Sequence, residues 1–484
     1  MKQYIFLTLL LAGFIPVFGQ LPGSQISQIL KEAVNSKRSK SIIVGIIDSA
    51  GRRVYSEGVL SDQNPAKPNA NTIYEIGSIT KVFTSLVLAD MSLKGKLSLE
   101  DPLSKFLPAS IKVPVRNGKE ITLLNLSTHT STFPRFPFNT DPKNIDDRYG
   151  DYSNNKLYEY LAAYQPDMDF GARWRYSNTA YGLLGNILTR VAGVKNYEQL
   201  VIDSICNPLK MSSTVISLTP ALLKNTAIGH SEWGEPVGFL NLSALDGAGA
   251  FRSNVNDLLT FAAANLGWVA SDLYPAMELT HESRIQKEAG GIDYATMGWT
   301  LRQNGGRNIV FKDGGTPGYQ TFIGIDKVKK FAVVVLSNSN NGVTDIGTHI
   351  IDPDSKINTY QYPWNLLDTI KQTLKNYGID EAIRLYQQLK LNKSSNLLFD
   401  ENQLNNLGIE LRRNKKIAAA LKIFELNATE YPNSVVAYES LGETYKRNGN
   451  RQKAITNFEK ARQLDPKNLH WDYVLNSLLA NKLQ

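Results

Sequence analysis

The stretch that decides the fold of this 484-residue chain is 74–81 (YEIGSITK), in which Ser78 precedes Lys81 by three positions. An apolar run follows, so Ser78 is predicted to open an amphipathic helix over 78–93 that ends before Gly95. Residues three apart share one face of a helix, which places Lys81 beside the Ser78 hydroxyl. The first-turn amides and the helix dipole favour negative charge at this helix end. We therefore predict a serine nucleophile that is activated by a lysine.

Other catalytic signatures do not occur in the sequence, which has no G-x-S-x-G, H-E-x-x-H, phosphate-binding or EF-hand motif. A second Ser-x-x-Lys, from Ser153 to Lys156, lies in a polar stretch and is predicted to belong to a loop. For Ser78 the plain alternative is an ordinary helix N-cap, with Lys81 as a solvated side chain. Two further motifs favour the catalytic interpretation.

A tyrosine supplies a second acid or base group. A lysine with the reference pKa of about 10.4 stays protonated near neutral pH, although burial can lower that value. Tyr-x-Asn occurs three times, and only the copy at 176–178 precedes an apolar helix. We expect Tyr176 to share the Ser78 proton with Lys81, and we expect its neighbour Asn178 to bind a substrate amide and orient the lysine. The alternative is that Tyr176 is a core aromatic.

A glycine-rich strand end at 312–318 (KDGGTPG) is the third element. Glycines along a strand permit close approach of a ligand. Lys312 can offer positive charge to a substrate carboxylate or to Tyr176, and its alternative is a plain edge-strand cation. The amides of Gly315 and Ser78 can flank a developing oxyanion. The expected substrate-binding residues are Asn178, Lys312, Gly314, Gly315 and Thr316.

Strand-forming runs occur at both ends of the first two thirds of the chain, with helical stretches between them. The runs are 41–48 and 53–59 near the start, and 308–312, 320–326 and 331–337 near the end. The predicted helices are 25–35, 78–93, 179–191 and 256–266. This order predicts an α/β (α+β) fold over 20–346, with one antiparallel sheet built from both chain ends and flanked by helices.

The remaining third of the chain carries a repeat. Leu407-Gly408, Ala420, Phe424 and Pro432 recur 34 positions later as Leu441-Gly442, Ala454, Phe458 and Pro466. This spacing is typical of tetratricopeptide helix pairs, in which small residues let the helices approach. We predict a linker over 347–376 and an all-α tetratricopeptide-repeat domain over 377–484. A short array is rarely stable alone, so we expect it to dock on the larger domain.

The first residues predict export. Lys2, an apolar run over 4–18 and the small Gly19 are typical of a secretory signal peptide over 1–19, and the run is too short for a comfortable membrane span. The alternative is an uncleaved anchor, because residues 17–19 (VFG) are a poor cleavage site. The expected location is secreted or periplasmic, with no membrane span after leader cleavage.

Composition excludes several classes of function. The 53 basic and 45 acidic residues give a net charge of +8 that is spread along the chain, so we expect no nucleic-acid partner. The single cysteine, Cys206, cannot form an internal disulfide, and the five histidines show no metal-ligand spacing. We therefore expect no metal and no organic cofactor, and we interpret His129 as structural.

Together the three motifs resemble those of the serine β-lactamase and penicillin-binding-protein superfamily, most closely its class C β-lactamase and D-alanyl-D-alanine carboxypeptidase branch. Supporting stretches are 123–131 (LLNLSTHTS) and 245–253 (LDGAGAFRS). The resemblance covers residues 25–340 and implies a β-lactamase/transpeptidase-like fold. The repeats resemble the tetratricopeptide extension of some exported relatives.

The resemblance also implies roles for single residues. Ser78 would be acylated, Lys81 and Tyr176 would act as general base and acid, and which of the two is the main base stays open. Lys312 would bind substrate, as in carboxylate-binding members. Asp313 departs from the family pattern of a small hydroxyl residue or glycine, and it adds a negative charge where a substrate carboxylate would lie.

The leading expectation is an exported serine hydrolase that works through an acyl-serine intermediate. The expected substrates, small molecules or peptides, are esters first, then D-amino-acid peptides, then β-lactams. The rival is an interaction protein, in which the repeats recruit a protein partner and the hydrolase-like domain is a non-catalytic scaffold. The joint presence of Ser78, Lys81, Tyr176 and Lys312 argues against the rival, because a scaffold does not need that set.

Overall fold

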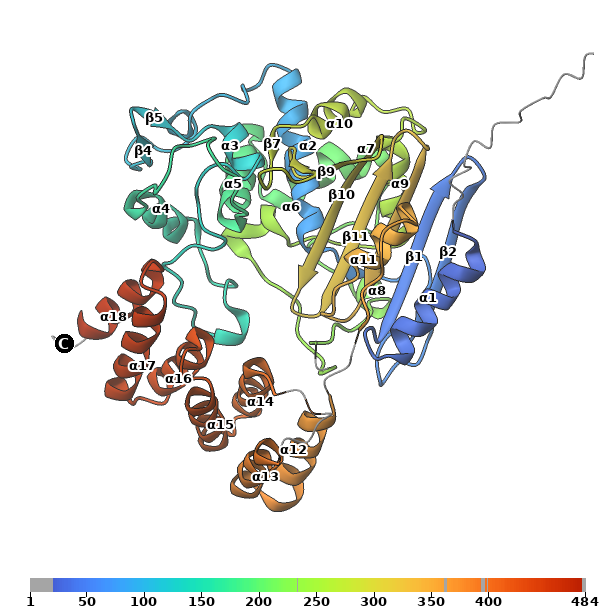
Figure 1. Ribbon diagram of the computed structural model, residues 1–484. Helices are drawn as coiled ribbons and strands as arrows, with labels where there is room; N and C mark the ends of the chain where they lie inside the picture. Colours follow the sequence, from blue (N-terminus) through green and yellow to red (C-terminus); the bar gives the residue numbers. More distant parts are fainter. Residues whose placement is uncertain (1–20, 233, 361–363, 393–396, 398, 481–484) are drawn as a thin grey trace, which may run out of the picture.

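The computed structural model describes residues 21–232, 234–360, 364–392, 397 and 399–480. The predicted signal peptide over 1–19 lies outside the described residues. None of the described helices combines the length and the apolar character that crossing a bilayer requires. The chain forms an α/β domain that is followed by a set of paired helices (Figure 1).

An eight-stranded sheet is the centre of the first domain, with the strand order β2-β1-β12-β11-β10-β9-β8-β7. Each neighbouring pair in this described sheet is antiparallel. The strands are β1 (Ser41–Asp48), β2 (Gly51–Gly58), β7 (Ile285–Gln286), β8 (Asp293–Ala295), β9 (Thr300–Asn304), β10 (Arg307–Thr316), β11 (Tyr319–Asp326) and β12 (Phe331–Ser337). Because β1 pairs with β12, the predicted sheet built from both chain ends is confirmed.

The strand predictions are accurate where the residues have high strand propensity and inaccurate where they do not. Strands β1 and β12 begin and end where predicted, because both are continuous apolar runs that are buried on both faces. Strand β10 extends to Thr316, beyond the predicted end at Lys312. Glycine and aspartate have low strand propensity, yet pairing with β11 keeps this segment extended.

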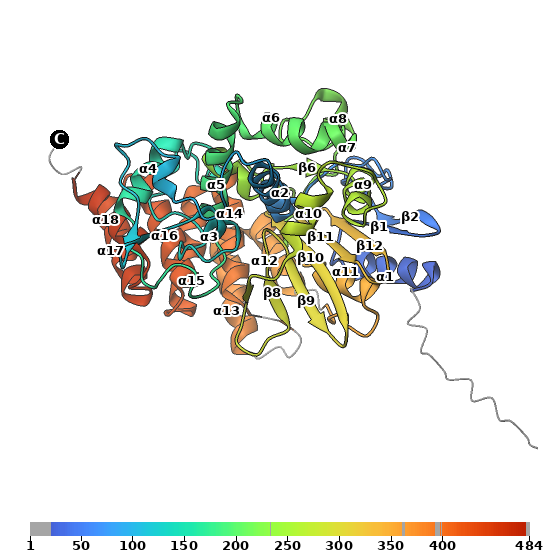
Figure 2. The same cartoon turned by 90° about the horizontal axis from the view of Figure 1, so that it is seen from above.

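Helices cover both faces of the sheet (Figure 2). One face carries α1 (Gly23–Asn35) and α11 (Thr344–Ile351), which share a buried apolar cluster with β1, β11 and β12. The other face carries α2 (Thr80–Leu93), α9 (Val255–Asn265) and α10 (Tyr274–His281), which belong to the larger core. The helix that follows Ser78 therefore lies inside the domain, against the sheet.

Helix α2 is buried on nearly every side, whereas its sequence predicts an amphipathic helix. Every residue from Thr80 to Ala89 is buried, and only its last turn reaches the surface, where Leu93 is exposed. The helix start also differs, because Ser78 lies in a 3₁₀ turn, Gly77–Ile79, that leads into α2. Contacts from several directions thus fix the turn that carries Ser78.

Smaller elements complete the domain. Two short pairs are β3 (Tyr74–Glu75) with β6 (Arg252–Ser253), and β4 (Val115–Arg116) with β5 (Lys119–Glu120). The remaining helices are α3 (Leu123–Ser127), α4 (Asn154–Ala163), α5 (Asn178–Ala192), α6 (Tyr197–Val201), α7 (Asn207–Leu209) and α8 (Pro220–Lys224). The β3–β6 pair ties the segment before Ser78 to the segment that follows Ala248.

The C-terminal helices have a core of their own. They are α12 (Trp364–Tyr377), α13 (Ile379–Leu391), α14 (Glu401–Arg413), α15 (Ile417–Glu430), α16 (Val435–Arg447), α17 (Arg451–Leu464) and α18 (Leu469–Ala480). Much of the stretch expected as a linker, 347–376, is helical, because it holds most of α11 and α12. Leu366, Leu367 and Ile370 of α12 pack in the core of the paired helices.

The repeated residues make the same contact twice. A Cβ atom added to Gly408 would lie 2.4 Å from the buried ring of Phe424, and one added to Gly442 would lie 3.0 Å from the ring of Phe458. The 34-residue spacing thus reflects a close approach of α14 to α15 that α16 and α17 repeat. These contacts confirm the predicted helix pairs.

Polar contacts dock the paired helices on the first domain, as expected for a short array. Most of them reach the loop at 138–148, which lies beside α16 in Figure 1. Arg148 pairs with Glu439 at 2.8 Å, and Lys446 pairs with Asp141 at 2.7 Å. The adjacent Arg447 donates to the carbonyl oxygens of Pro142 and Lys143, at 2.7 and 2.9 Å.

Candidate active site

The turn that carries Ser78 is held against strand β10. Gly77 has a φ angle of 50°, which favours glycine, and an added Cβ would lie 2.8 Å from the backbone nitrogen of Gly315. At Gly314, an added Cβ would lie 2.1 Å from the carbonyl oxygen of Ile76. The two backbones therefore approach each other closely only because both positions lack a side chain.

Lys81 is completely buried beside Ser78. Its Nζ donates to Ser78 Oγ at 3.1 Å, to Asn178 Oδ1 at 2.7 Å and to the Ala248 carbonyl oxygen at 2.5 Å. Burial lowers the pKa of Lys81 to about 8, with a smaller contribution of the same sign from Lys312. A substantial fraction of the amine is therefore neutral at mildly alkaline pH and can accept a proton.

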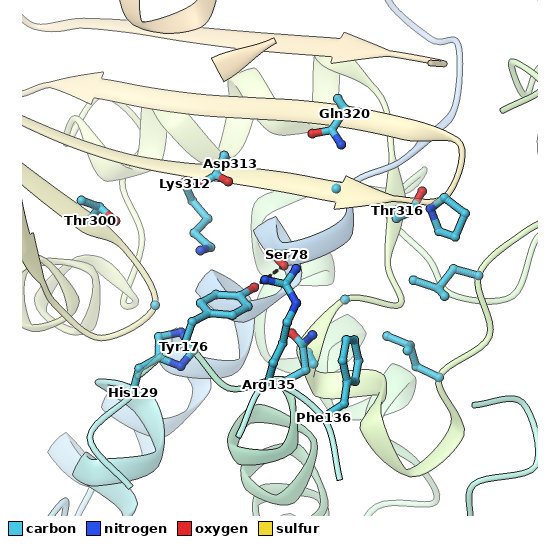
Figure 3. A pocket seen from close by; sticks show the side chains of 18 of the residues that line it. Ser78, His129, Arg135, Phe136, Tyr176, Thr300, Lys312, Asp313, Thr316 and Gln320 are labelled. Atoms are coloured by element: carbon cyan, nitrogen blue, oxygen red, sulfur yellow. Dashed lines mark hydrogen bonds between the residues drawn. The ribbon is translucent and has the colours of Figure 1, made fainter. Parts of the chain in front are cut away.

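Tyr176 contacts Ser78 from the opposite side. Its hydroxyl lies 2.6 Å from Ser78 Oγ, and Figure 3 shows the two groups facing each other. The loop before α5 is fixed by His129, whose Nδ1 accepts from the Ser177 N–H at 3.1 Å. Burial lowers the pKa of His129 well below its usual value, so the ring is neutral and acts as this acceptor.

These contacts decide between the alternatives left open by the sequence. Lys81 has 0% exposure and is not a solvated side chain, and the Ser78 hydroxyl contacts two polar side chains rather than capping the helix. Tyr176 points into the cavity described below instead of into the core. Ser153 is exposed and caps the N-terminus of α4, where it accepts from the Lys156 N–H at 3.4 Å.

Strand β10 presents a free edge to the site. Strand β9 pairs with it only as far as Phe311, whereas β11 pairs with it as far as Thr316 on the other side, within the described strands. Lys312 lies at one end of this edge and its Nζ is 5.1 Å from the ring centroid of Tyr176. Because Lys312 is only 7% exposed and faces the site, the interpretation as a plain edge-strand cation is wrong.

A cavity of about 740 Å³ opens over these groups (Figure 3). Ser78, Tyr176 and Asn178 lie in its wall, together with Lys312, Gly315 and Thr316 of β10. Gly314 does not line the cavity, because it faces the carbonyl oxygen of Ile76. The structure thus brings every predicted site residue to one place, with Lys81 buried behind the wall and Gly314 at the close contact between the strand and the serine turn.

Two cations of the cavity were missed by the sequence interpretation. The guanidinium carbon of Arg135 lies 5.1 Å from the ring centroid of Tyr176, and Lys287 Nζ lies 4.6 Å from that of Trp174. Lys287 also donates to Thr300 Oγ1 at 3.3 Å. Arg135 lies in an irregular loop and Lys287 just after a two-residue strand, and no spacing rule marks either position.

Positive charge dominates the cavity. Burial lowers the pKa of Lys312, and burial together with the charge of Lys312 lowers the pKa of Lys287. Asp313 lies on the same wall with its side chain exposed, and although the surrounding protein partly desolvates its carboxylate, the positive charge of Lys312 lowers its pKa overall. The cavity therefore holds one carboxylate among several cationic side chains and suits a substrate with negative charge.

A comparison with protein families assigns the first domain. The model of the beta-lactamase family matches residues 26–350, which is most of the chain. This chain belongs to the beta-lactamase family. It is a serine hydrolase of the branch that includes carboxypeptidases, and a tetratricopeptide model matches residues 435–468 of its tail. The resemblance and the fold class predicted from the sequence are therefore confirmed.

Individual relatives support the same assignment. The D-alanyl-D-alanine-carboxypeptidase/endopeptidase AmpH of Escherichia coli (strain K12) is 28% identical, over 63% of this chain and 83% of the relative. A beta-lactamase of Lysobacter lactamgenus is 24% identical, over 65% and 86%. Among solved structures, a beta-lactamase/D-alanine carboxypeptidase from Yersinia pestis complexed with citrate is 25% identical, with a TM-score of 0.57, over 66% of this chain and 94% of that chain.

Replacing Gly314 tests the close approach of β10 to the serine turn. The Cβ of Gly314→Ala would press on the Ile76 carbonyl oxygen, so we expect a loss of about 1–3 kcal/mol in the free energy of unfolding. Gly315→Ala is the matched control, because its Cβ meets only the end of the Gln320 side chain, at 3.0 Å. Equal thermal unfolding curves for the two variants would contradict this account.

Proposed function

We propose that this beta-lactamase-family hydrolase cleaves an amide bond through an acyl intermediate on Ser78, with Lys81 and Tyr176 as the groups that move its proton. The observation that carries the proposal is the contact of both groups with one oxygen, at 3.1 Å from Lys81 Nζ and 2.6 Å from the Tyr176 hydroxyl. A scaffold has no need to bury an amine at this place, so the rival function as a non-catalytic interaction protein is not favoured.

In the first step, Ser78 Oγ attacks the substrate carbonyl carbon and its proton passes to the Lys81–Tyr176 pair. The carbonyl oxygen becomes an oxyanion, which accepts from the backbone N–H groups of Ser78 and Gly315. The C–N bond then breaks, and the departing amine takes the proton. The product is an ester between the acyl group and Ser78.

In the second step, water attacks the carbonyl carbon of this ester and gives a proton to the same pair. The C–O bond to Ser78 breaks, the serine recovers the proton, and a carboxylic acid leaves. Asn178 holds Lys81 through its Oδ1, and its amide nitrogen is a donor for a substrate carbonyl. The two steps use only this chain and water.

The proposed substrate carries a negative charge near the scissile amide. Support comes from the cations Arg135, Lys287 and Lys312 in the cavity wall, and the family relatives include carboxypeptidases, which act beside a carboxylate. An extended substrate can lie along the free edge of β10, with its carboxylate at Lys312. Amide substrates, as D-amino-acid peptides or β-lactams, are thereby favoured over the esters that the sequence interpretation placed first.

We further propose that the hydrolase domain spans 20–346 and that the repeat domain begins with α12, because α12 packs among the repeat helices. The leader over 1–19 and a secreted or periplasmic location remain part of this proposal. N-terminal sequencing of the protein purified from its own cells tests cleavage after Gly19.

Covalent labelling tests the nucleophile. A fluorophosphonate or a fluorescent penicillin should label the natural chain once, and Ser78→Ala should remove the label while leaving the unfolding temperature similar. Ser153→Ala, which changes the exposed serine of the second Ser-x-x-Lys, is the control and should label like the natural chain. A label that persists in Ser78→Ala, or a folded natural chain that takes no label, would contradict the proposal.

The pH dependence of labelling tests Lys81. Below its pKa of about 8 the amine is protonated and cannot accept the serine proton, so the acylation rate should rise with pH, about tenfold per unit. The rate should level off above about pH 8. Lys81→Arg, whose guanidinium stays charged, should be slow and show no such inflection. A flat profile for the natural chain between pH 6 and 9 argues against Lys81 as the proton acceptor.

Removing the acid of the cavity tests the charge preference. Asp313→Thr should lower KM for a substrate with a carboxylate by roughly fivefold, because repulsion across an open site is worth about 1 kcal/mol. A neutral ester that is hydrolysed by the same chain serves as the control and should keep its KM. If the KM values of both substrates change equally, Asp313 does not act through its charge.

A further inference from the structure

A second cavity lies between the hydrolase domain and the repeat helices, with a volume of about 920 Å³. We call it the interdomain groove. One wall comes from the loops at 144–149 and 236–241 of the hydrolase domain, with Leu223 of α8. The other wall comes from helices α14 and α16, which contribute Ile409, Arg412, Arg413, Glu439, Ser440 and Glu443.

The interdomain groove continues the catalytic cavity. Tyr149, Leu240 and Pro317 line both, so the two hollows meet along a shared rim. Strand β10 runs from Lys312 toward this rim, because Pro317 directly follows its last residue, Thr316. A substrate chain that lies along the free edge with its carboxylate at Lys312 therefore leaves the catalytic cavity past Pro317. At the usual rise of a strand, the distance along the edge from Lys312 to Pro317 is about 16 Å.

We propose that the interdomain groove binds the acyl-side arm of an extended peptide substrate, the part of the chain on the far side of the scissile amide from its carboxylate. This inference rests on the proposed function. It makes the repeat domain one wall of the substrate-binding site, and it names an oligopeptide, rather than a small β-lactam or ester, as the preferred substrate.

The chemistry of the groove fits a peptide. Val237, Phe239, Leu240, Leu223 and Ile409 form an apolar lining, and Leu223 is 49% exposed. Such a lining accepts side chains of a bound peptide without demanding one sequence.

A buried donor of the groove has no acceptor. Arg412 pairs with Asp146 through Nη2 at 3.3 Å, and its side chain is only 9% exposed. Its Nε has no hydrogen-bond partner among the described residues. A buried donor without an acceptor costs free energy, and a carbonyl of a bound peptide would satisfy it once the Arg412 side chain turns toward the groove.

The wall at Leu240 is fixed relative to the nucleophile. The N–H of Leu240 donates to Glu75 Oε1 at 2.7 Å, and Arg252 Nη2 reaches both that oxygen, at 3.1 Å, and the Leu240 carbonyl, at 3.3 Å. Glu75 lies three residues before Ser78. The apolar rim and Ser78 are therefore held in fixed positions relative to each other. A substrate that spans both sites requires this.

The opposite wall is fixed by ion pairs across the domain boundary. Asp146 accepts from both Arg412 and Arg413, at 3.3 and 3.1 Å, and Arg148 pairs with Glu439 at 2.8 Å. The charges of this wall are thus largely used to hold the domains together. Selectivity in the groove is left to the apolar lining and to backbone contacts.

Two peptides that end in D-alanyl-D-alanine test the proposal. One carries only an acetyl group as its acyl-side arm, and the other carries an acetylated four-residue peptide in its place. Release of D-alanine from the longer peptide should show a kcat/KM about tenfold higher, because remote contacts contribute to transition-state binding. Ile409→Trp and Leu223→Trp, which fill the groove, should remove this advantage and leave the acetylated dipeptide unaffected.

The control is Leu93→Trp, which changes an exposed leucine of α2 outside the groove and should keep the advantage of the longer peptide. Equal kcat/KM for the two peptides on the natural chain would overturn the groove as a subsite and leave the proposed function intact. If neither peptide is hydrolysed, the oligopeptide is not the substrate and the groove proposal fails with it, whereas the proposed amide hydrolysis fails only if β-lactams are left intact as well.

Peptide binding to an inactive variant tests the groove proposal independently of the proposed catalytic function. Calorimetric titration of Ser78→Ala should give about tenfold tighter binding for the longer peptide, and the double variant Ser78→Ala, Ile409→Trp should bind both peptides alike. Equal affinity for the two peptides in the single variant would overturn the groove proposal whatever the turnover.

Discussion

The burial of one amine is the constraint on which the rest of the site depends. Lys81 lies where water does not reach, and an ammonium group is costly there unless several acceptors surround it. Its contacts come from three separate segments: the turn of Ser78, the first turn of α5 at Asn178, and the carbonyl of Ala248. The same burial that lowers its pKa thus requires the segments to meet, so folding and chemistry share one set of contacts.

Much of the site could be predicted because its residues carry local signals. Ser78 and Lys81 stand three apart at a helix start, and Lys312 stands at a glycine-rich strand end. Arg135 and Lys287 carry no such signal, since their place in the cavity depends on how irregular loops fold over Tyr176. The burial of nearly all of α2 was missed for a related reason: a run of apolar and small polar residues does not reveal that partners cover the helix on every side.

The repeat domain shows the same contrast between features that a sequence pattern predicts and features that depend on tertiary contacts. The repeat was predictable because one helix contact recurs, with glycine against phenylalanine. The extent of the linker was not, because a polar stretch with prolines precedes α12 and hides the apolar face formed by Leu366, Leu367 and Ile370. The ionic contacts between the domains were also unpredictable, since charged residues of α14 and α16 look like any solvated helix surface until Asp146 and Arg148 are placed beside them.

The pairing of β1 with β12 constrains how the chain reaches its native state. These strands are neighbours in the sheet, yet nearly the whole hydrolase domain is synthesised between them. The hairpin of β1 and β2 must wait for β12 with its apolar residues uncovered, a topology that slows folding and exposes the nascent chain to aggregation. The repeat helices make mostly local contacts and leave the ribosome after the hydrolase domain, so they can form quickly once their docking surface is complete.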